Sequence, residues 1–450
     1  MQLSFDHGTL VLAGAPDFGL EDLPGLRFDP RVGLHRAPAF RYRELLVALE
    51  RRGFHVEDLV RPRPPPATGP WHSVALRPYQ EEAALSWELA GSRGIVALPT
   101  GSGKTSVALS LLASTRARAL ILVPTRALLQ QWLSMLGLVY KGPIGCLGDG
   151  RHTREAITVS TFESAYRHMP RVGQRFELLI VDEAHHFGNG VRDEALEMCV
   201  AEQRLGLTAT PPEGPALSRL GELLGPIVYG LTVQDLKGRW LSDFDLVVLR
   251  LALDAEERDR YAADYQLFAQ VNREFRRFHP LGSWQEFVAA ASQSPQGRAA
   301  LAAWRRTRRL ASFNRAKARA VRTLLGRHRD SKVLVFTADN ETAYAIAREH
   351  LVMPITCEVG RAERVRALEA FRRGELRTLV SARVLNEGID VPDADVAVIV
   401  GGTQGRREHV QRIGRLLRPS PGKRALVYEL VTMATSEARY AAERRRGLAA

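Results

Sequence analysis

The segment ALPTGSGKT at 97–105 has the residue types of a phosphate-binding loop. It follows a short apolar run and precedes a helical pattern that begins near Lys104, the context that such a loop requires. Glycines let backbone N–H groups turn inward around an oxyanion, a lysine reaches the β- and γ-phosphates, and a threonine hydroxyl can bind Mg²⁺. A strict match would have glycine in place of Ala97, but the GSGKT core is intact. We expect the loop to hold a nucleotide, with the last residue also a metal ligand, through Thr100, Gly101, Ser102, Gly103, Lys104 and Thr105.

A second motif, VDEAHH at 181–186, ends another apolar run. Asp182 is placed to hold Mg²⁺ through water, and the carboxylate of Glu183 is placed to orient and deprotonate an attacking water. His185 and His186 raise the alternative of a histidine metal site. We expect two adjacent histidines to point in different directions from a loop, and the sequence offers no evident third ligand, so it favours the carboxylate pair.

Both motifs lie in a region where apolar strands alternate with amphipathic helices. This alternation, from 75 to 230, is typical of a parallel sheet covered on both faces. It lapses after 230, where 254–330 is helical in pattern, and then returns. The predicted strands are 95–99, 119–124, 156–160, 177–185 and 204–210 in a first sheet, and 332–338, 376–382, 395–402 and 424–431 in a second.

The charge of the chain favours a polyanionic partner. Its 450 residues include 63 Lys and Arg against 50 Asp and Glu, a formal net charge of +13. The stretch 271–330 has 14 basic and 3 acidic residues, so most of the excess lies there. Three cysteines exclude a disulfide framework and a four-cysteine zinc site and fit a reducing compartment. No apolar run could span a membrane and the first residues show no secretion signal, so we expect a cytoplasmic protein with no membrane partner.

The order of the motifs resembles that of a superfamily 2 helicase or translocase. GSGKT, DEAH and TAT (208–210) occur together with RPYQ (77–80), VPTRALLQQW (123–132), STFES (160–164), VLNEGIDVPDADVAV (384–398) and QRIGRLLRP (411–419). The resemblance covers about 75–430. It implies an α/β fold with two tandem RecA-like parallel-sheet motor domains, and it implies ATP and Mg²⁺ as cofactors.

In the first unit, the resemblance gives roles to residues outside the phosphate loop. Gln80, with Arg77 in the same motif, would contact the nucleotide through its adenine base. Arg126 and Thr161 would contact nucleic acid, Thr161 through a phosphate.

In the second unit, two arginines one helical turn apart share a face of a helix. The resemblance implies that Arg415 and Arg418 reach the γ-phosphate as arginine fingers, and Gln411 lies a further turn back on that face. Gly388 would let the backbone approach the nucleotide, and Asp390 is a candidate for the ribose. The expected catalytic set is then Lys104, Asp182, Glu183, Gln411, Arg415 and Arg418.

The N-terminal region indicates which branch of superfamily 2 the chain resembles. LRFDPRVGLHRAPAFRYRELLVAL at 26–49 resembles the damage-recognition-like domain that precedes the motor in XPB-type DNA helicases (the xeroderma pigmentosum group B family). Locally, 3–14 predicts a hairpin around Asp6-His7-Gly8, and 40–53 predicts a helix. XPB-type motors also carry a small helical thumb that grips duplex DNA, and the basic stretch 304–322 suits that surface. Its expected DNA contacts are Arg305, Arg306, Arg308 and Arg309; Trp284 and Trp304 fit core packing better than base stacking.

These patterns divide the chain into four parts. We expect an N-terminal α+β domain at 1–60, a Pro-rich linker at 61–74, a first motor domain at 75–230 and a second at 231–450. The second would include a basic helical thumb-like insertion at about 255–330.

The resemblance implies an ATP-dependent 3′→5′ DNA helicase or translocase in DNA repair of the nucleotide excision type. It would act on single-stranded and duplex DNA and work with a separate nuclease. The alternatives are an RNA remodeller of the same superfamily, a restriction-type motor subunit and a scaffold without hydrolysis. DEAHH and TAT differ from the DEAD and SAT of the commonest RNA branch, no nuclease motif is evident, and the hydrolytic residues are all present.

One departure bears on strand separation. The family usually has an Arg-Glu-Asp triplet shortly after TAT, implicated in opening the duplex. Here PPEGPALSRLGELLG follows at 211–225, and the triplet occurs nowhere in the chain. The sequence therefore favours translocation over processive unwinding, and it does not indicate an oligomeric state.

Overall fold

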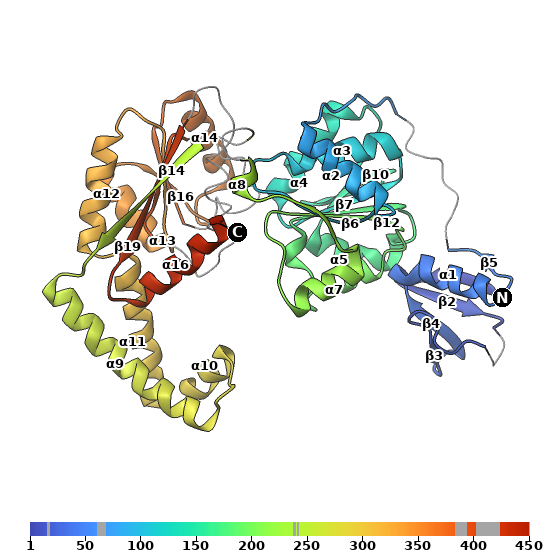
Figure 1. Cartoon of the computed structure of the whole chain (residues 1–450), viewed down its shortest axis with the longest axis horizontal. Helices are drawn as coiled ribbons and strands as arrows, with labels where there is room; N and C mark the ends of the chain where they lie inside the picture. Colours follow the sequence, from blue (N-terminus) through green and yellow to red (C-terminus); the bar gives the residue numbers. More distant parts are fainter. Residues whose placement is uncertain are drawn as a thin grey trace. The chain divides into compact units, whose positions relative to one another are not determined.

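A computed structural model describes residues 1–15, 19–60, 69–236, 240, 243–382, 394–401 and 424–449. The described residues form two compact units (Figure 1), one within Met1–Thr232 and the other from Val233 onward. The first contains an N-terminal domain and one parallel sheet, and the second contains another parallel sheet and a helical insertion. The fold is therefore α/β, with the tandem RecA-like sheets that the sequence predicted.

The N-terminal domain is a small sheet in the order β3-β4-β2-β1-β5, with α1 (Tyr42–Arg51) beside it. The predicted hairpin is confirmed, because β1 and β2 pair antiparallel across a turn at His7 and Gly8, both with positive φ. The predicted helix is confirmed as α1, preceded by a 3-10 turn, η1 (Ala39–Arg41). The strands are β1 (Gln2–Asp6), β2 (Thr9–Ala13), β3 (Arg27–Asp29), β4 (Leu34–Pro38) and β5 (Glu57–Asp58).

The N-terminal domain and the first motor domain share apolar side chains. Phe40 of η1 is buried in the core of the motor domain, while Val200 of the motor domain is buried in the core of the N-terminal domain. The guanidinium of Arg219 lies 5.9 Å from the centre of the Phe40 ring. A methyl group added at Gly8 would come within 2.5 Å of Met198, so the hairpin turn also lies close against the motor domain. The two domains of this unit are thus packed together.

The first motor sheet has the order β13-β6-β12-β11-β7-β10-β8-β9, and every pairing in it is parallel except that of β8 with β9. All five strands predicted for it are present. Three further strands were not predicted, since β8 contains two glycines, β9 is polar and exposed, and β13 is short. The strands are β6 (Arg93–Ala97), β7 (Ala119–Val123), β8 (Ile144–Gly148), β9 (Arg151–Thr153), β10 (Ile157–Thr161), β11 (Leu178–Asp182), β12 (Gln203–Thr208) and β13 (Ile227–Gly230).

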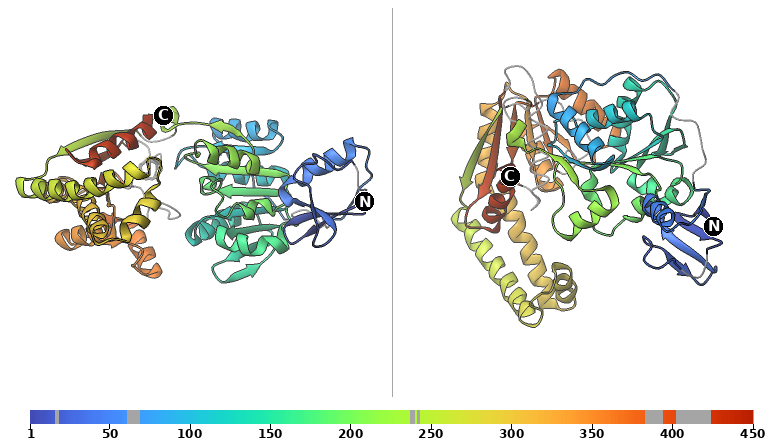
Figure 2. Two further views of the ribbon diagram at one scale, coloured as in Figure 1. Left: turned by 90° about the horizontal axis from the view of Figure 1, so that it is seen from below. Right: turned by 45° about the vertical axis from the view of Figure 1, so that its right-hand side comes forward.

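Helices cover both faces of this sheet (Figures 1 and 2). One face packs against α5 and α7 through a core that includes Leu120, Met169 and Leu220, while α2, α3 and α4 lie on the other. Because the strands are buried on both faces, they read as continuous apolar runs. The helices are α2 (Pro78–Leu89), α3 (Lys104–Thr115), α4 (Arg126–Val139), α5 (Phe162–Val172), η2 (Ala184–His186), α6 (Glu194–Glu197) and α7 (Pro215–Leu224).

The second motor sheet has the order β14-β19-β18-β15-β17-β16, and all its described pairings are parallel. The four predicted strands are confirmed, but the expected lapse of strand structure after 230 is wrong at β14, which pairs with β19 along nine residues. This half-buried strand at the end of the sheet has Asp and Arg among its apolar residues, so it shows no continuous apolar run. The strands are β14 (Asp243–Leu251), β15 (Val333–Phe336), β16 (Met353–Ile355), β17 (Thr378–Ser381), β18 (Val396–Ile399) and β19 (Arg424–Thr432).

Three helices form an insertion between β14 and the rest of this sheet (Figure 1). They are α9 (Ala255–Phe278), α10 (Trp284–Ser292) and α11 (Pro295–Ser312); α9 and α11 lie side by side. Phe287 and Leu301 form a small core there. The indoles of Trp284 and Trp304 pack with ring centres 4.6 Å apart, and the Arg308 guanidinium lies 5.0 Å from the Trp304 ring centre. The two tryptophans therefore pack together as expected, although Trp284 stays 41% exposed.

The fourth helix in the predicted range of the insertion, α12 (Arg315–Arg327), packs on the second motor sheet. Its Val321 and Leu324 are buried with Val335 and Val398 of the second motor core. Within the predicted range of the insertion, the helices therefore divide into three that project and one that packs on the sheet. The other helices among the described residues of this unit are α8 (Val233–Leu236), α13 (Asn340–His350), α14 (Arg361–Arg373) and α16 (Ser436–Ala449). No helix among the described residues is both long enough and apolar enough to cross a membrane.

Candidate nucleotide site and nucleic-acid interface

The predicted phosphate loop lies between the end of β6 and the start of α3, as the sequence indicated. Gly101 and Gly103 have φ values of +86° and +82°, a region that residues with a Cβ rarely adopt. The loop thus turns the backbone back toward the first N–H groups of α3, which lack partners within the helix. Those groups and the helix dipole suit the loop to an anion.

Two side chains from α2 hold this loop from behind. Tyr79 Oη donates to the carbonyl of Ser102 at 2.6 Å, and Gln80 Nε2 donates to the same carbonyl at 2.7 Å. Gln80 Oε1 accepts from the N–H of Arg77 at 2.9 Å, so both ends of its amide are engaged. A Cβ at Gly103 would lie 2.4 Å from Gln80 Nε2, so the approach requires glycine. The structure brings Arg77 and Gln80 to the phosphate loop, and their contact with a base stays a prediction.

The lysine of the loop bonds to the loop itself. Lys104 Nζ donates to the carbonyls of Leu98 at 3.0 Å and Pro99 at 3.4 Å. Neutral carbonyls are weaker partners for an ammonium group than phosphate oxygens, so this group can exchange them for a bound anion. Thr105 lies beside it in the first turn of α3, half-buried. Thr100 Oγ1 is buried and has no hydrogen-bond partner among the described residues, so it is available to a ligand.

Asp182 ends β11, and β11 is separated from the loop-bearing strand β6 by β12 alone. Its carboxylate is buried and accepts from Trp132 Nε1 at 2.9 Å and from the N–H of Glu183 at 3.0 Å. Burial raises the pKa of Asp182, while the hydrogen bond from Trp132 and the charge of Lys104 oppose that rise. A buried carboxylate next to a phosphate loop fits a site for a divalent cation, because a cation would favour its charged form.

The backbone of Glu183 is in the left-handed region, with φ +52° and ψ +48°. A non-glycine residue there costs on the order of 1 kcal/mol and is common at functional sites. Its Oε2 lies 3.4 Å from His185 Nδ1, and that nitrogen is 3.1 Å from the hydroxyl of Thr208. Thr208 Oγ1 also accepts from the N–H of Thr210 at 3.2 Å. The general-base candidate and the TAT motif therefore both lie next to His185.

The two histidines differ from their expected arrangement. The prediction that His185 and His186 point in different directions is wrong, since their rings stack with centres 4.5 Å apart at 29°. His186 also contacts Phe162, the first residue of α5, edge-on. In the described part of the chain, no group of three His, Cys, Asp or Glu side chains is arranged to hold a metal.

The predicted nucleic-acid residues of this unit lie after two paired strands. β7 precedes Arg126 and β10 ends at Thr161, and these two strands are neighbours in parallel register. Arg126 is 75% exposed, with its guanidinium 3.8 Å from a carboxylate oxygen of Asp149. Thr161 Oγ1 caps α5 by accepting from the N–H of Ser164 at 3.3 Å. The structure thus brings an exposed arginine and a helix N-terminus to one edge of the sheet, and their contact with nucleic acid stays a prediction.

The insertion exposes the four arginines predicted to contact DNA, which are Arg305, Arg306, Arg308 and Arg309. Two of them are in ion pairs. The Arg306 guanidinium donates to both carboxylate oxygens of Asp264, with Nε 3.0 Å from Oδ2, and Arg309 pairs with Glu341. Exposed pairs of this kind are weak, so they lower the charge available to a phosphate without removing it.

Five predicted residues lie outside the described part of the chain, and the structure says nothing of them. They are Gly388, Asp390, Gln411, Arg415 and Arg418.

Two aromatic residues shape the site and were not singled out from the sequence. Tyr79 holds the phosphate loop and Trp132 holds Asp182. Both lie inside motifs that carry the resemblance, RPYQ and VPTRALLQQW. A buried Tyr or Trp usually has a hydrogen-bond partner for its O–H or N–H. The presence of these two residues inside the motifs was therefore the sequence signal that could have predicted their contacts.

The phosphate loop after β6 and the carboxylates after β11, on one of two RecA-like sheets, define a nucleotide-driven motor of the helicase type. Three family models match the chain. The model for the xeroderma pigmentosum group B helicase damage recognition domain matches 3–60, that for the type III restriction enzyme res subunit matches 73–213, and that for the helicase conserved C-terminal domain matches 316–420.

Relatives match nearly the whole chain. The DNA 3′-5′ translocase XPB2 of Sulfurisphaera tokodaii is 34% identical over 425 residues, covering 94% of this chain and 96% of that protein. The DNA 3′-5′ helicase XPB of Mycobacterium tuberculosis is 31% identical over 443 residues, covering 94% and 72%. The crystal structure of the Pyrococcus furiosus Hef helicase domain shares the fold, with a TM-score of 0.52 at 18% identity, covering 82% of this chain and 98% of that one. The chain therefore belongs to the XPB family of superfamily 2 helicases and translocases.

Proposed function

We propose that this protein hydrolyses ATP with Mg²⁺ to move 3′→5′ on DNA, as part of DNA repair. The observation that carries the proposal is the phosphate loop and the Asp182–Glu183 pair at one edge of a sheet, in a chain of the XPB family. The relatives that match across the chain are named for 3′-5′ movement on DNA, and relatives in the transcription and repair factor IIH are named for repair.

The residues of the first sheet divide the work of hydrolysis. Lys104 and the N–H groups of α3 would bind the β- and γ-phosphates, and Glu183 would hold the attacking water and take its proton. Thr105 and Asp182 would hold Mg²⁺, which supplies charge neutralisation between the phosphates. Burial of Asp182 supports this assignment, since its charged form needs a nearby cation.

The second motor domain would complete the reaction. Arg415 and Arg418 would stabilise charge on the γ-phosphate, with Gln411 behind them, and Gly388 and Asp390 would approach the nucleotide. Their motif matches support these roles.

The nucleic-acid partner would be DNA, single-stranded and duplex. Arg126 and Thr161 would track one strand, and the insertion would contact the duplex backbone through Arg305, Arg306, Arg308 and Arg309. A restriction-type motor is disfavoured because the match to that family model ends at 213, whereas a relative named XPB2 covers 94% of the chain. A separate nuclease partner and a cytoplasmic location stay predictions.

The test is the ATPase rate of the purified chain with no nucleic acid, single-stranded DNA, duplex DNA and RNA. We expect DNA to stimulate hydrolysis and RNA to stimulate it far less. Stimulation by RNA alone would favour the RNA remodeller, and no hydrolysis under any condition would favour the scaffold.

A second test follows from the absent Arg-Glu-Asp triplet. Opening a duplex costs roughly 1.4 kcal/mol for each base-pair step, so a motor without a wedge depends on fraying or on a partner. In place of the triplet is α7, whose Arg219 is paired with Glu197 and Glu222. We expect translocation, measured by displacement of streptavidin from DNA ends, with weak unwinding of forks. Processive unwinding of long duplexes by the chain alone would show that the triplet is not needed.

A further inference from the structure

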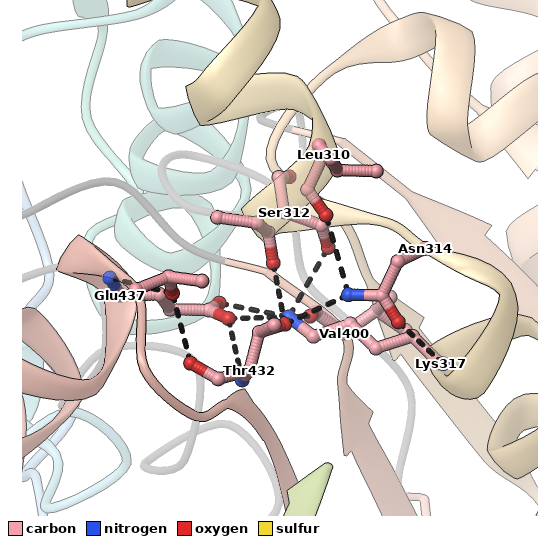
Figure 3. A network of polar contacts seen from close by, with 9 residues as sticks. Leu310, Ser312, Asn314, Lys317, Val400, Thr432 and Glu437 are labelled. Carbon is pink, nitrogen blue, oxygen red and sulfur yellow. Dashed lines mark hydrogen bonds and ion pairs between the residues drawn. The ribbon is translucent and has the colours of Figure 1, made fainter. Parts of the chain in front are cut away.

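At the foot of the helical insertion, a lysine is completely buried in a polar network (Figure 3). Lys317 Nζ lies 2.8 Å from both carboxylate oxygens of Glu437, 2.5 Å from the carbonyl of Val400 and 3.2 Å from the carbonyl of Ser312. An ammonium group has three protons to donate, so these acceptors satisfy it fully. Glu437 is also buried, at 7% exposure.

A second set of hydrogen bonds runs beside this ion pair. Asn314, the N-cap of α12, accepts from the N–H of Lys317 at 3.0 Å and donates to Thr432 Oγ1 at 2.9 Å. Thr432 Oγ1 in turn donates to the carbonyl of Ala311 at 2.7 Å, and the N–H of Thr432 donates to Glu437 Oε2 at 2.9 Å. Side chain and main chain thus alternate in one continuous network.

The network joins elements that are far apart in the sequence. Ala311 and Ser312 end α11, the returning helix of the insertion, and Thr432 and Glu437 lie at the end of β19 and the start of α16. The outgoing helix of the insertion is attached as well, because Tyr261 Oη on α9 accepts from the N–H of Ser436 at 3.1 Å. Both long helices of the insertion are therefore bonded to the junction of β19 and α16.

The same lysine holds the end of β18. Val400 follows that strand, and its carbonyl is an acceptor for Lys317. At Gly401 an added Cβ would lie 2.9 Å from Ser312 Oγ, so the main chain of β18 and the end of α11 approach closely. The sequence continues from there to QRIGRLLRP at 411–419, the segment with the predicted arginine fingers. One ammonium group therefore contacts both the end of α11 and the end of β18, the strand that precedes the segment with the predicted arginine fingers.

Stability alone does not account for such a pair. Removing two charges from water is costly, and a well-packed apolar pair of similar volume is often as stable or more stable. A bidentate pair does, however, fix the relative positions of the segments that contribute its partners, since a shifted partner leaves a charge buried without its counter-ion. The geometry of the pair thus favours one placement of the insertion against β18.

We propose that Lys317 and Glu437 are positioning residues that couple DNA binding by the insertion to ATP hydrolysis. DNA bound to α9 and α11 would favour one position of the end of α11, where the insertion meets the second motor sheet. The Lys317 contact would then favour a matching position of Val400 and of the segment that follows it. This inference rests on the proposed function and deepens it, because it assigns the DNA stimulation of the ATPase to a particular contact.

The experiment compares the double variant Lys317→Met/Glu437→Leu with the parent chain. The double variant removes both charges at similar volume, so neither charge is left buried without its counter-ion and the fixed geometry is lost. Basal ATPase, DNA-stimulated ATPase, KM for ATP, Kd for duplex DNA and thermal unfolding are measured for each. Lys332→Met is the matched control, since Lys332 lies in the same domain and its ammonium bonds to the main-chain carbonyl of Arg372 at 2.8 Å.

The double variant is expected to fold but to unfold at a lower temperature than the parent, because the N–H of Thr432 and the carbonyls of Val400 and Ser312 lose their partners. Its basal rate, KM and Kd are expected to stay close to those of the parent. Its stimulation by DNA is expected to fall by a factor in the range of about 5 to 150 that coupling between sites typically spans. The control should keep full stimulation. Glu437→Gln, which keeps shape but weakens the pair, should give an intermediate loss.

Normal stimulation in the double variant would overturn the inference. So would failure of both the double variant and Glu437→Gln to fold, because the pair would then be needed for the fold itself. Absence of DNA stimulation in the parent chain would count against the proposed function instead, so the two failures are distinguishable.

Discussion

Two lysines, each in the first turn of a helix in one of the two motor domains, have different kinds of partners. Lys104 begins α3 and bonds to two neutral carbonyls of its own loop, at 3.0 and 3.4 Å. Lys317 lies in the first turn of α12, is completely buried, and is paired with both oxygens of a carboxylate at 2.8 Å. The first ammonium can exchange its partners for a phosphate, whereas the second can exchange them only by breaking a buried ion pair.

The carboxylates next to these lysines differ in the same way. Burial raises the pKa of Asp182, and its charged form is favoured only by the hydrogen bonds from an indole and a main-chain N–H and by the nearby charge of Lys104. Glu437 is buried against a full positive charge. The carboxylate of Asp182 is thus available for a bound cation to neutralise, whereas that of Glu437 is neutralised by Lys317.

The largest effect that tests this comparison is expected at Glu183. Glu183→Gln should abolish hydrolysis while ATP binding stays nearly intact, because the amide keeps the shape but cannot take a proton, and general-base catalysis contributes about 10²–10⁴-fold. Single-turnover hydrolysis and binding of a fluorescent ATP analogue are measured. The control is Glu163→Gln, an exposed acid on α5 that pairs with Arg167. Hydrolysis at a tenth of the parent rate or more would rule out the proposed role.

The next effect tests whether the second unit takes part in chemistry at all. Arg415→Ala and Arg418→Ala should each slow hydrolysis by about 10³-fold or more, if they act as arginine fingers. Affinity for DNA without nucleotide should change little. Normal turnover in both variants would mean that the second unit contributes no charge to the reaction.

A smaller effect is expected at the indole that holds Asp182. Trp132→Phe removes the hydrogen bond at 2.9 Å and keeps an aromatic ring in the core. Outer partners of metal ligands typically contribute about 10–100-fold to affinity, so the Mg²⁺ concentration for half-maximal ATPase should rise at least about tenfold. Trp87→Phe is the matched control, because Trp87 is equally buried and donates to the carbonyl of Arg204. Equal Mg²⁺ dependence in the two variants would argue against a metal site at Asp182.

The insertion offers a comparison within itself. In the variant with Arg305 and Arg308 changed to Ser, the log–log salt slope of duplex binding should fall by about 1.8, near 0.9 for each phosphate contact. The matched variant changes Arg306 and Arg309, which are paired with Asp264 and Glu341, and its slope should fall less. An unchanged slope in both would mean that this helix face is only solvated.

The sequence predicted the positions of the phosphate loop and of the Asp182–Glu183 pair in the first sheet better than it predicted the rest of the molecule. The glycines at 101 and 103 and the acids at 182 and 183 have local roles, so their motif specifies their place. β14 was missed because a half-buried strand at the end of a sheet needs no continuous apolar run. Contacts such as Trp132 with Asp182 depend on the packing of distant elements, and no local pattern specifies them.

The network around Lys317 was missed for a related reason. Lys317 was counted with the basic surface of 304–322, since charge counting treats each lysine as solvated. Its partner Glu437 lies 120 residues away in the sequence. Only the fold of the second sheet brings the two together, so the basic stretch overstates the charge that is available to DNA.

The smallest expected effect is on thermal stability and involves the buried carboxylate of Asp182 in the first motor domain. Burial raises the pKa of Asp182 above its ordinary value of 3.8, so the folded protein binds that proton more tightly than the unfolded chain does. The stabilising contribution of the protonated form is therefore present at low pH and is lost as the pH rises through the folded pKa.

Without Mg²⁺, Asp182→Asn should raise the melting temperature at neutral pH, by about 2–4 °C for each kcal/mol recovered. The gain should shrink as the pH falls toward 4, and Mg²⁺ should stabilise the parent but not the variant. Thermal unfolding at several pH values, with and without Mg²⁺, measures both. A variant less stable than the parent at every pH would show that the Trp132 and main-chain hydrogen bonds already outweigh the cost of burying this charge.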